Sequence, residues 1–501
     1  MVKVQNEKLL KWNKKDYSLN VFVYLINAII ITGIFILNDY LVGRENQAVF
    51  TLDIAKTAMF LILTLLTLLV MFLYFYFEER NFLKSPSNSQ MLFLCIEIVL
   101  VLGFVTKNYI GIYIRPLTAV AILLLFLCNR KSAMFMHTIY CVIQLINDIL
   151  CGTSFASMDY ALPIVAISAG FLAIVCMDKA YSRLKLIFLS LVPSIPIIAY
   201  VLLTFIPGLP NDFVKQLICA LASGPLAVVV LQIFLPFFEA GFKKVSIFKL
   251  AELTDHKAKL IKKMIQECPG TFNHSIIVSN IAEACATAIG EDALLARVCA
   301  YYHDIGKLRR PEFFKENQQG EENPHDDLTP ELSANIIKSH TLDGYKLAIK
   351  NRIPKEIAEV CIQHHGTLPI LYFYEKAKRY TDGEVDLVQY CYTGVKPKTK
   401  IAAILMIADG CEAAVRSISA RNRENVKNVV RGIVNDRMRL GQFDECEITI
   451  KELNIIISAV VNNLSGIHHQ RIEYPKASLD GVEADSVADI IADTKEDGKQ
   501  D

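Results

Sequence analysis

The sequence lacks several features that mark common protein classes. Its 13 cysteines are scattered and none forms a CxxC pair, which argues against a zinc ribbon or a disulfide framework. This usage fits a reducing compartment for the C-terminal half. The 52 basic and 51 acidic residues give a net charge of +1, so the positive surplus expected of a protein that binds a nucleic-acid polymer is absent. Strand signals are also few, and the expected fold class is all-α.

Apolar residues divide the chain into two halves. Residues 18 to about 240 are dominated by Leu, Ile, Val, Phe and Ala, whereas residues 243–501 carry most of the charge. We therefore predict a cytoplasmic segment 1–17, a polytopic helical membrane domain 18–240, a cytoplasmic all-helical domain 245–475 and a disordered acidic tail 476–501.

Eight apolar segments approach the roughly 20 residues that a helix needs to span a bilayer core. They are 18–42, 53–77, 91–106, 110–128, 133–151, 160–177, 185–206 and 214–238. The third is short, and the fourth begins with Arg115 and Pro116. The first is too long for a signal peptide and lacks a small-residue cleavage site, so we predict that it is retained as a helix.

Basic residues predict the orientation of these segments, because Lys and Arg concentrate in cytoplasmic loops. They precede the first segment and recur in every second loop: Lys3, Lys8, Lys11, Lys14, Lys15; Arg80, Lys84; Arg130, Lys131; Lys179, Arg183, Lys185; Lys243 and Lys244. The other loops are short and hold little beyond Arg44, Lys107 and Lys215. We therefore expect an even number of crossings, both termini in the cytoplasm and no extracellular domain between the spans.

Three polar residues lie within predicted spans, namely His137, Asn147 and Asp148. Polar side chains inside a membrane often mark a ligand or ion pathway. The alternative is that they lie near the interface or hydrogen-bond one another between helices. The sequence leaves both interpretations open.

Seven candidate metal ligands lie along about 135 residues of the second half. They are His274, His303, Asp304, His340, His364, His365 and Asp409. Imidazole and carboxylate groups bind first-row transition metals, and an aspartate has two oxygens with which to bridge two ions. Each residue alone would more often be a core, surface or turn residue. Together they exceed the needs of one tetrahedral ion and predict a binuclear metal hydrolase.

The candidate ligands fall at predicted helix ends. Gly306 follows His303 and Asp304 where a C-cap glycine would lie, and Gly366 follows the paired histidines in the same way. A helix C-terminus favours a nearby cation.

Two other patterns predict helix boundaries in this half. Thr329 and Pro330 are a typical N-cap and first-turn pair. Leu250, Leu253, Leu260 and Ile261 fit one face of a helix that continues from the last span. We expect short breaks at the intervening prolines and glycines.

At these residues the sequence resembles the HD phosphohydrolase superfamily and, within it, the bacterial seven-transmembrane-receptor HD proteins. The resemblance runs from about Phe248 to Tyr474. Its motifs are Cys268-Pro-Gly-Thr-Phe-Asn-His274, Tyr301-Tyr-His-Asp-Ile-Gly-Lys307, Pro311-Glu-Phe-Phe, Glu316-Asn-Gln, Asn323-Pro-His-Asp, Gln363-His-His-Gly-Thr367, Ala408-Asp-Gly-Cys-Glu-Ala-Ala414, His468 and Arg471-Ile-Glu-Tyr474.

The resemblance implies a ligand set for two divalent transition-metal ions. One ion would be held by His274, His303, Asp304 and Asp409, and the other by His340, His364 and His365, with Asp304 bridging. The mixed donors suit iron or manganese, and zinc stays open. Asp304 and Lys307 would be catalytic, with Lys307 stabilising charge on the phosphoryl oxygens. The alternative for Lys307 is a surface lysine after a glycine.

Characterised members of the resembled family hydrolyse cyclic di-AMP. The resemblance therefore implies a phosphodiesterase anchored in the bacterial cell membrane, in which a hydroxide bridging the two ions cleaves cyclic di-AMP to linear pApA. The expected partners are cyclic di-AMP and the lipid bilayer, but no nucleic-acid polymer. A homodimer is compatible with the sequence.

The sequence departs from the resembled family in two places and leaves rival functions open. Residues 43–52 stand where a large extracellular domain is common, and Cys391–Lys400 is poorer in arginine and proline than usual. One rival is a cyclic di-GMP phosphodiesterase, although the Gly-Tyr-Pro motif of that type is absent after the paired histidines. Another is a non-catalytic nucleotide-binding membrane receptor. A transporter is disfavoured because no internal repeat is evident.

Overall fold

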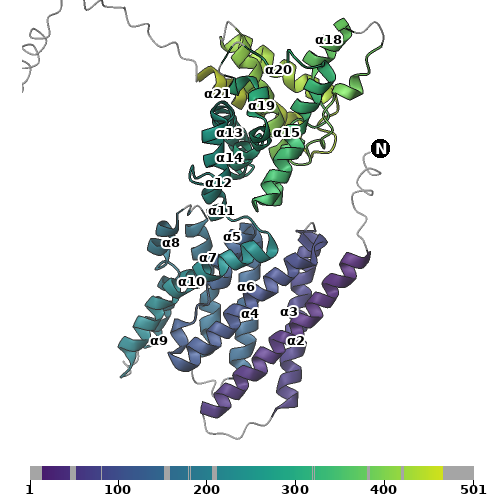
Figure 1. The fold of residues 1–501 in the computed structure, drawn as a ribbon. Helices are drawn as coiled ribbons and strands as arrows, with labels where there is room; N and C mark the ends of the chain where they lie inside the picture. Colours follow the sequence, from purple (N-terminus) through teal and green to yellow (C-terminus); the bar gives the residue numbers. More distant parts are fainter. Residues whose placement is uncertain are drawn as a thin grey trace, which may run out of the picture.

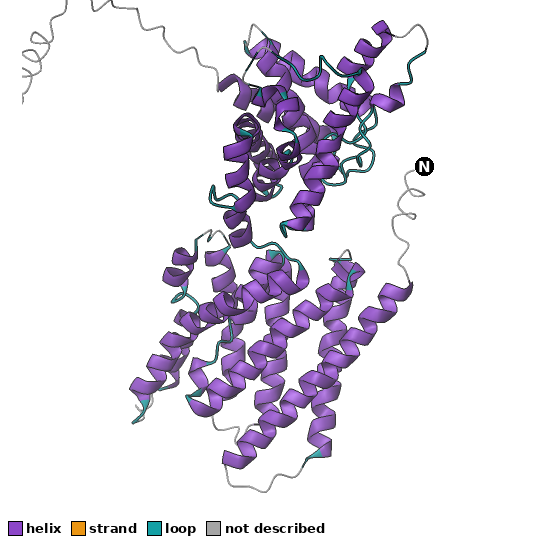
Figure 2. Cartoon of the chain, viewed as in Figure 1, coloured by secondary structure: helices purple, strands orange, loops and turns teal. Residues whose placement is uncertain are grey.

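The computed structural model contains two helical parts joined near residue 248 (Figure 1). It describes residues 14–466, apart from 46–51, 81, 152–157, 179, 181, 206–210, 319, 321, 381–383 and 419–421. Within these residues there is no strand beyond one isolated bridge, which confirms the all-α class (Figure 2). Most of the predicted segment 1–17 and the whole predicted tail 476–501 lie outside the described residues.

The N-terminal part is a bundle of helices. Its members are α2 (Lys14–Glu45), α3 (Ile54–Phe77), α4 (Pro86–Tyr109), α5 (Ala119–Leu127), α6 (Arg130–Cys151), α7 (Leu162–Met177), α8 (Arg183–Leu189), α9 (Ser194–Thr204) and α10 (Phe213–Phe242). Only residues 46–53 separate α2 from α3, so no large domain is inserted between them.

Six helical segments of the described chain are long and apolar enough to cross a membrane. They are Tyr17–Val42, Ile54–Phe77, Pro86–Tyr109, Arg130–Cys151, Arg183–Thr204 and Phe213–Phe242. The remaining two predicted spans correspond to shorter apolar helices, Ile112–Leu127 and Leu162–Met177. Large apolar side chains such as Phe22, Ile29 and Leu66 are exposed on the outer helices, as a surface facing lipid requires. The protein is a multi-pass membrane protein, and a total of eight crossings stays a prediction.

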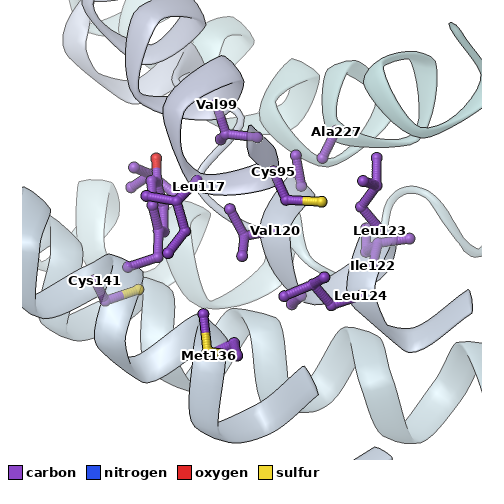
Figure 3. Packing of buried hydrophobic residues seen from close by; sticks show 14 of the residues in the cluster. Cys95, Val99, Leu117, Val120, Ile122, Leu123, Leu124, Met136, Cys141 and Ala227 are labelled. Atoms are coloured by element: carbon purple, nitrogen blue, oxygen red, sulfur yellow. The ribbon is translucent and has the colours of Figure 1, made fainter. Parts of the chain in front are cut away.

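Helix α5 forms the centre of the bundle. All nine of its residues are apolar and all nine are buried, so the helix packs against its neighbours on every side. Figure 3 shows Val120 and Leu123 of α5 packed near Val99 of α4 and Ala227 of α10. Arg115, noted near the start of the fourth predicted span, lies in the turn between the short helix η2 (Ile112–Ile114) and α5.

The C-terminal part is a second helical domain with a hydrophobic core of its own, which begins at Leu250. Its helices are α11 (Ile247–Leu253), α12 (Lys259–Glu267), α13 (Pro269–Ile289), α14 (Ala293–Tyr302), α15 (Pro330–Lys350), α16 (Lys355–Ala358), α17 (Val360–Gln363), α18 (Leu371–Tyr380), α19 (Lys400–Ser417), α20 (Arg423–Arg439) and α21 (Ile450–Gly466). Short 3₁₀ helices η4 (Ile305–Arg309), η5 (Pro311–Phe313), η6 (Lys315–Asn317) and η7 (Leu387–Tyr390) lie between them.

The prediction that one helix continues from the last span is wrong. Helix α10 ends at Phe242, and Lys243 adopts a left-handed conformation with φ +53°. A new helix, α11, then begins where the Ser246 hydroxyl accepts a hydrogen bond from the Lys249 amide. The four predicted apolar residues are all buried, but they are divided between α11 and α12.

The predicted start of α15 is confirmed. The Thr329 hydroxyl accepts a hydrogen bond from the Leu332 amide, and Pro330 occupies the first turn. Pro fits there because its missing N–H would have no partner inside the helix.

Candidate metal centre

The seven predicted ligands converge in the C-terminal domain, although they come from five separate parts of the chain. His274 lies on α13, His303 and Asp304 follow α14, His340 lies on α15, His364 and His365 follow α17, and Asp409 lies on α19. They form two groups, and within each group the potential ligand atoms lie within 4.8 Å of one another: His274, His303, Asp304 and Asp409; and His340, His364 and His365.

Asp304 connects the two groups through its two carboxylate oxygens. Its Oδ2 lies 3.3 Å from Nε2 of His303 and 3.8 Å from Nε2 of His274. Its Oδ1 lies 3.3 Å from Nε2 of His340 and 3.6 Å from Nε2 of His364. One carboxylate therefore faces both groups, which is the arrangement that a bridging ligand needs.

Asp409 also faces both groups, which the sequence analysis missed. Its Oδ1 lies 3.0 Å from Nε2 of His274, and its Oδ2 lies 3.7 Å from Nδ1 of His365. His365 is the most exposed of the five histidines, with 23% of its side chain accessible. It therefore marks the solvent-facing side of the cluster.

The backbone fixes the protonation of three of the histidine rings. Nδ1 of His303 donates to the Ala300 carbonyl at 2.7 Å, Nδ1 of His340 to the Ile337 carbonyl at 2.5 Å, and Nδ1 of His364 to the Val360 carbonyl at 3.1 Å. A carbonyl oxygen only accepts hydrogen bonds, so each Nδ1 must carry the proton. Each Nε2 is then the nitrogen that can bind an ion, once any proton on it has been released.

Two buried atoms indicate that these residues fit metal ions. Nε2 of His303 and Oδ1 of Asp304 have no hydrogen-bond partner, although both side chains are at most 2% exposed. Buried polar atoms without a partner are rare and costly in proteins. An ion coordinated by each atom would satisfy it.

Glu412 is a further functional candidate that the sequence analysis did not identify. Nδ1 of His274 donates to the Glu412 carboxylate at 2.6 Å, and both side chains are buried. Glu412 follows Asp409 by three residues and therefore lies on the same face of α19. A carboxylate at this place orients the imidazole and makes its other nitrogen a better ligand.

The glycine after the His-Asp pair permits a close approach of two helices. Gly306 lies inside η4 and does not adopt the left-handed conformation of a C-cap, so that prediction is wrong. A Cβ atom at this position would lie 1.9 Å from the backbone oxygen of His340. Glycine thus lets η4 pack directly on α15, which brings Asp304 to His340. Gly366 does adopt a left-handed conformation, with φ +52°.

Lys307 is held between two carboxylates. Its Nζ lies 2.7 Å from Oδ2 of Asp304 and 2.7 Å from Oε1 of Glu316. Burial disfavours the charged amine, but the two carboxylates outweigh it and raise the pKa of Lys307 above its ordinary range. Glu316 also accepts a hydrogen bond from the Thr271 hydroxyl, which fixes η6 against the start of α13. Lys307 therefore contacts the carboxylate that connects both ligand groups.

Neighbouring carboxylates favour the protonated forms of His274 and His303. Burial opposes protonation of His274 and His303, but hydrogen bonds that His274 donates to Asp409 and Glu412 raise the pKa of His274 to about 8. Asp304 and Asp409 raise the pKa of His303 to about 10. The pKa of each aspartate is held well below its ordinary range by these histidines, despite burial. Without an ion, the two histidines therefore favour the protonated form at neutral pH.

Tyr392 covers the second group. Its ring stacks on His365 with a centroid distance of 4.3 Å and an interplanar angle of 25°, and its edge faces His340 at 6.0 Å. Tyr392 lies in the segment Cys391–Lys400, which the sequence analysis singled out only as a departure from its relatives. The ring restricts the access of solvent to this side of the cluster.

Comparison with known proteins identifies both parts of the chain. Residues 57–246 match the family described as "7TM receptor with intracellular HD hydrolase". Residues 271–414, which include all seven predicted ligands, match the HD domain family. These two matches account for the membrane bundle and for the helical domain that follows it. The second helical domain is accordingly called the HD domain below.

Two curated relatives share much of the chain. The cyclic-di-AMP phosphodiesterase PgpH of Bacillus subtilis is 37% identical over 434 residues, which cover 83% of this chain and 60% of the relative. The protein of the same name from Listeria monocytogenes is 39% identical over 389 residues, which cover 75% of this chain and 52% of the relative. The chain thus spans a little over half of the length of these relatives.

Two solved structures resemble the HD domain. The crystal structure of the L. monocytogenes phosphodiesterase PgpH HD domain is 47% identical, covers 42% of this chain and 100% of the solved chain, and has a TM-score of 0.41. The same domain in complex with cyclic di-AMP is 46% identical, covers 43% and 100%, and has a TM-score of 0.42.

Proposed function

We propose that the HD domain is a metal-dependent phosphodiesterase with a binuclear centre. The observation that carries this proposal is the placement of Asp304, whose two oxygens face two separate groups of ligand atoms. His274, His303, Asp304 and Asp409 would hold one ion. His340, His364 and His365 would hold the second, shared through Asp304.

The donor set favours iron or manganese. Five imidazoles and two carboxylates offer nitrogen and oxygen atoms, and no thiol belongs to either group. Mixed nitrogen and oxygen donors around ions with higher coordination numbers suit iron or manganese. Two bound divalent ions would supply an activated water as the nucleophile and would polarise the phosphoryl oxygens.

The residues of the chain would position and shield these reactants. Lys307 neutralises part of the negative charge of Asp304. Its ammonium would stabilise charge that develops on the phosphoryl oxygens in the transition state. Glu412 orients His274. Tyr392, above His365, would exclude solvent from the exposed side of the site.

The proposed substrate is cyclic di-AMP. Two relatives named cyclic-di-AMP phosphodiesterase support this choice, as does the absence of a Gly-Tyr-Pro motif after the paired histidines. Attack of water at one phosphorus would break its bond to the ribose 3′ oxygen. One such cleavage opens the ring and yields linear pApA.

The test is hydrolysis by the full chain in detergent, with Mn²⁺ or Fe²⁺, of cyclic di-AMP and of cyclic di-GMP in parallel. We expect faster turnover of cyclic di-AMP with pApA as first product, loss of activity in Asp304→Ala, and full activity in the control His256→Ala, which changes an exposed histidine outside both groups. Equal or faster turnover of cyclic di-GMP would contradict the substrate. Binding of ions and nucleotide without turnover would favour a non-catalytic receptor.

The same proposal places the HD domain in the cytoplasm. The basic residues of the loop between α3 and α4 and of the segment after α10 lie at the end of the bundle that joins the HD domain (Figure 1). Positive loops face the cytoplasm. Dimerisation of the chain stays a prediction, which light scattering of the solubilised protein would test.

A further inference from the structure

A buried polar cluster lies at the end of the helical bundle that is distant from the HD domain. Lys107 is near the C-terminal end of α4, Asp148 is near the C-terminal end of α6, and Arg115 follows η2. Figure 1 shows that α4 and α6 both run away from the HD domain, so these ends meet on the far side of the bundle. The cluster is therefore separate from the candidate metal centre.

The carboxylate of Asp148 accepts hydrogen bonds from four side chains. Nη1 of Arg115 donates to its Oδ2 at 2.6 Å, and Nζ of Lys107 donates to its Oδ1 at 3.2 Å. The amides of Gln144 and Asn147 each approach Oδ1 at 3.4 Å. Three of these four donors share Oδ1, so that oxygen has no capacity for another donor.

The two basic side chains retain unused donors. Nη2 of Arg115 has no hydrogen-bond partner, although the Arg115 side chain is completely buried. The Lys107 ammonium donates to Asp148 with one of its three N–H groups, and 22% of its side chain is exposed. Two positive charges face a single carboxylate, which leaves an excess of one positive charge in an apolar bundle.

An uncompensated charge is costly in such surroundings, and ionisable groups at membrane depth often serve a function. We propose that Arg115 and Lys107 bind one small monovalent anion, such as chloride or acetate, at this end of the bundle. The anion accepts hydrogen bonds from Nη2 of Arg115 and from the free N–H groups of Lys107. It neutralises the excess charge, and it enters from the exposed side of Lys107.

This assignment answers the question that the sequence left open for two of its three polar residues. Asp148 and Asn147 do satisfy each other, together with Asn38 of α2, whose amide donates to Asn147 at 3.3 Å. They form the rigid anionic and polar side of the cluster. On the basic side, Nη2 of Arg115 is the buried donor without a partner.

The test is the thermal stability of the full chain in a neutral detergent, titrated with sodium chloride or sodium acetate against a bulky sulfonate buffer at constant ionic strength. The wild-type protein should show a saturable rise in Tm with at least one of the two anions. Lys107→Gln should weaken the apparent affinity at least about tenfold, as expected for loss of a charged hydrogen bond.

A matched control comes from the same end of the bundle. Lys56 is also 22% exposed, but it is paired one to one with Asp39, so Lys56→Gln should keep the anion response. Because Arg115→Gln alone would strand a buried carboxylate, the second variant is Arg115→Gln with Asp148→Asn, which removes the pair together and should abolish the response.

The other outcomes contradict the proposal. A wild-type response that the double variant retains, or one that Lys56→Gln loses as fully as Lys107→Gln, would show a general salt effect. Stabilisation only by vesicles that contain phosphatidylglycerol, with neither chloride nor acetate active, would assign the cluster to a lipid headgroup instead.

Discussion

Replacing Glu412 by Gln should weaken metal binding and slow hydrolysis without unfolding the protein. The Glu412 carboxylate accepts a hydrogen bond from Nδ1 of His274 at 2.6 Å, and both side chains are almost completely buried. The amide of Gln has the same shape but no charge. It would orient the imidazole less firmly and would make Nε2 of His274 a weaker ligand.

The magnitude follows from the change in the hydrogen bond. A bond to a charged group contributes about 1.5–3 kcal/mol and a neutral one about 1 kcal/mol, so the loss is about 1–2 kcal/mol. This energy corresponds to a reduction in affinity of about 5–30-fold for the first ion. Glu424→Gln, on the exposed side of α20, is the matched control and should change neither quantity.

The assay is a metal titration of the chelator-treated full chain, followed by the rate of hydrolysis at saturating metal. We expect a shifted midpoint for Glu412→Gln and a Tm of the metal-free protein that stays close to the wild-type value. A midpoint and a rate equal to those of the wild type would refute the reasoning that Glu412 orients a metal ligand.

Three further predictions concern the glycine contact, the protons and the topology. Gly306→Ala should lower the Tm by several degrees, because its Cβ would collide with the His340 backbone, whereas Gly432→Ala meets no atom within 4 Å and should be neutral or stabilising. The pKa values of His274 and His303 are raised to about 8 and about 10, so metal binding at pH 7 should release protons. Calorimetry in buffers of different ionisation enthalpy measures this release. In the metal-free protein the same pKa shifts contribute stability that is complete below about pH 6.5 and is lost as pH rises through about 8 and about 10. A reporter fused after Asp501 should be active in the cytoplasm, and activity only outside the cell would contradict the predicted orientation.

The sequence predicted the fold class and the convergent residues because both depend on patterns that are visible locally. Apolar runs of membrane length appear directly in the sequence, and the His-Asp and His-His pairs stand out among only ten histidines. The cap at Thr329 is equally local, since it depends on three neighbouring residues.

Other features depend on contacts that sequence patterns do not reveal. Helix α5 has the composition of a membrane span, but it is too short and lies at the centre of the bundle. Lys243 breaks the helix after the last span through a left-handed conformation, which nothing in its residue type indicates.

Within the site, the features that the sequence did not predict depend on contacts between residues that lie far apart in the chain. Glu412 resembles any other acidic residue until α13 places His274 beside it, 138 positions earlier in the chain. Gly306 looks like a helix terminator, yet its role comes from α15 packing against it. The second face of Asp409 became evident only from the position of His365.

The measurement that tests the central claim most directly is the metal content of three purified proteins, the wild type, Asp304→Ala and His340→Ala, each assayed for hydrolysis of cyclic di-AMP. Because Asp304 faces both ligand groups, we predict two ions in the wild type, about one in His340→Ala, and loss of both ions together with activity in Asp304→Ala. Two full ions in Asp304→Ala would contradict the binuclear arrangement.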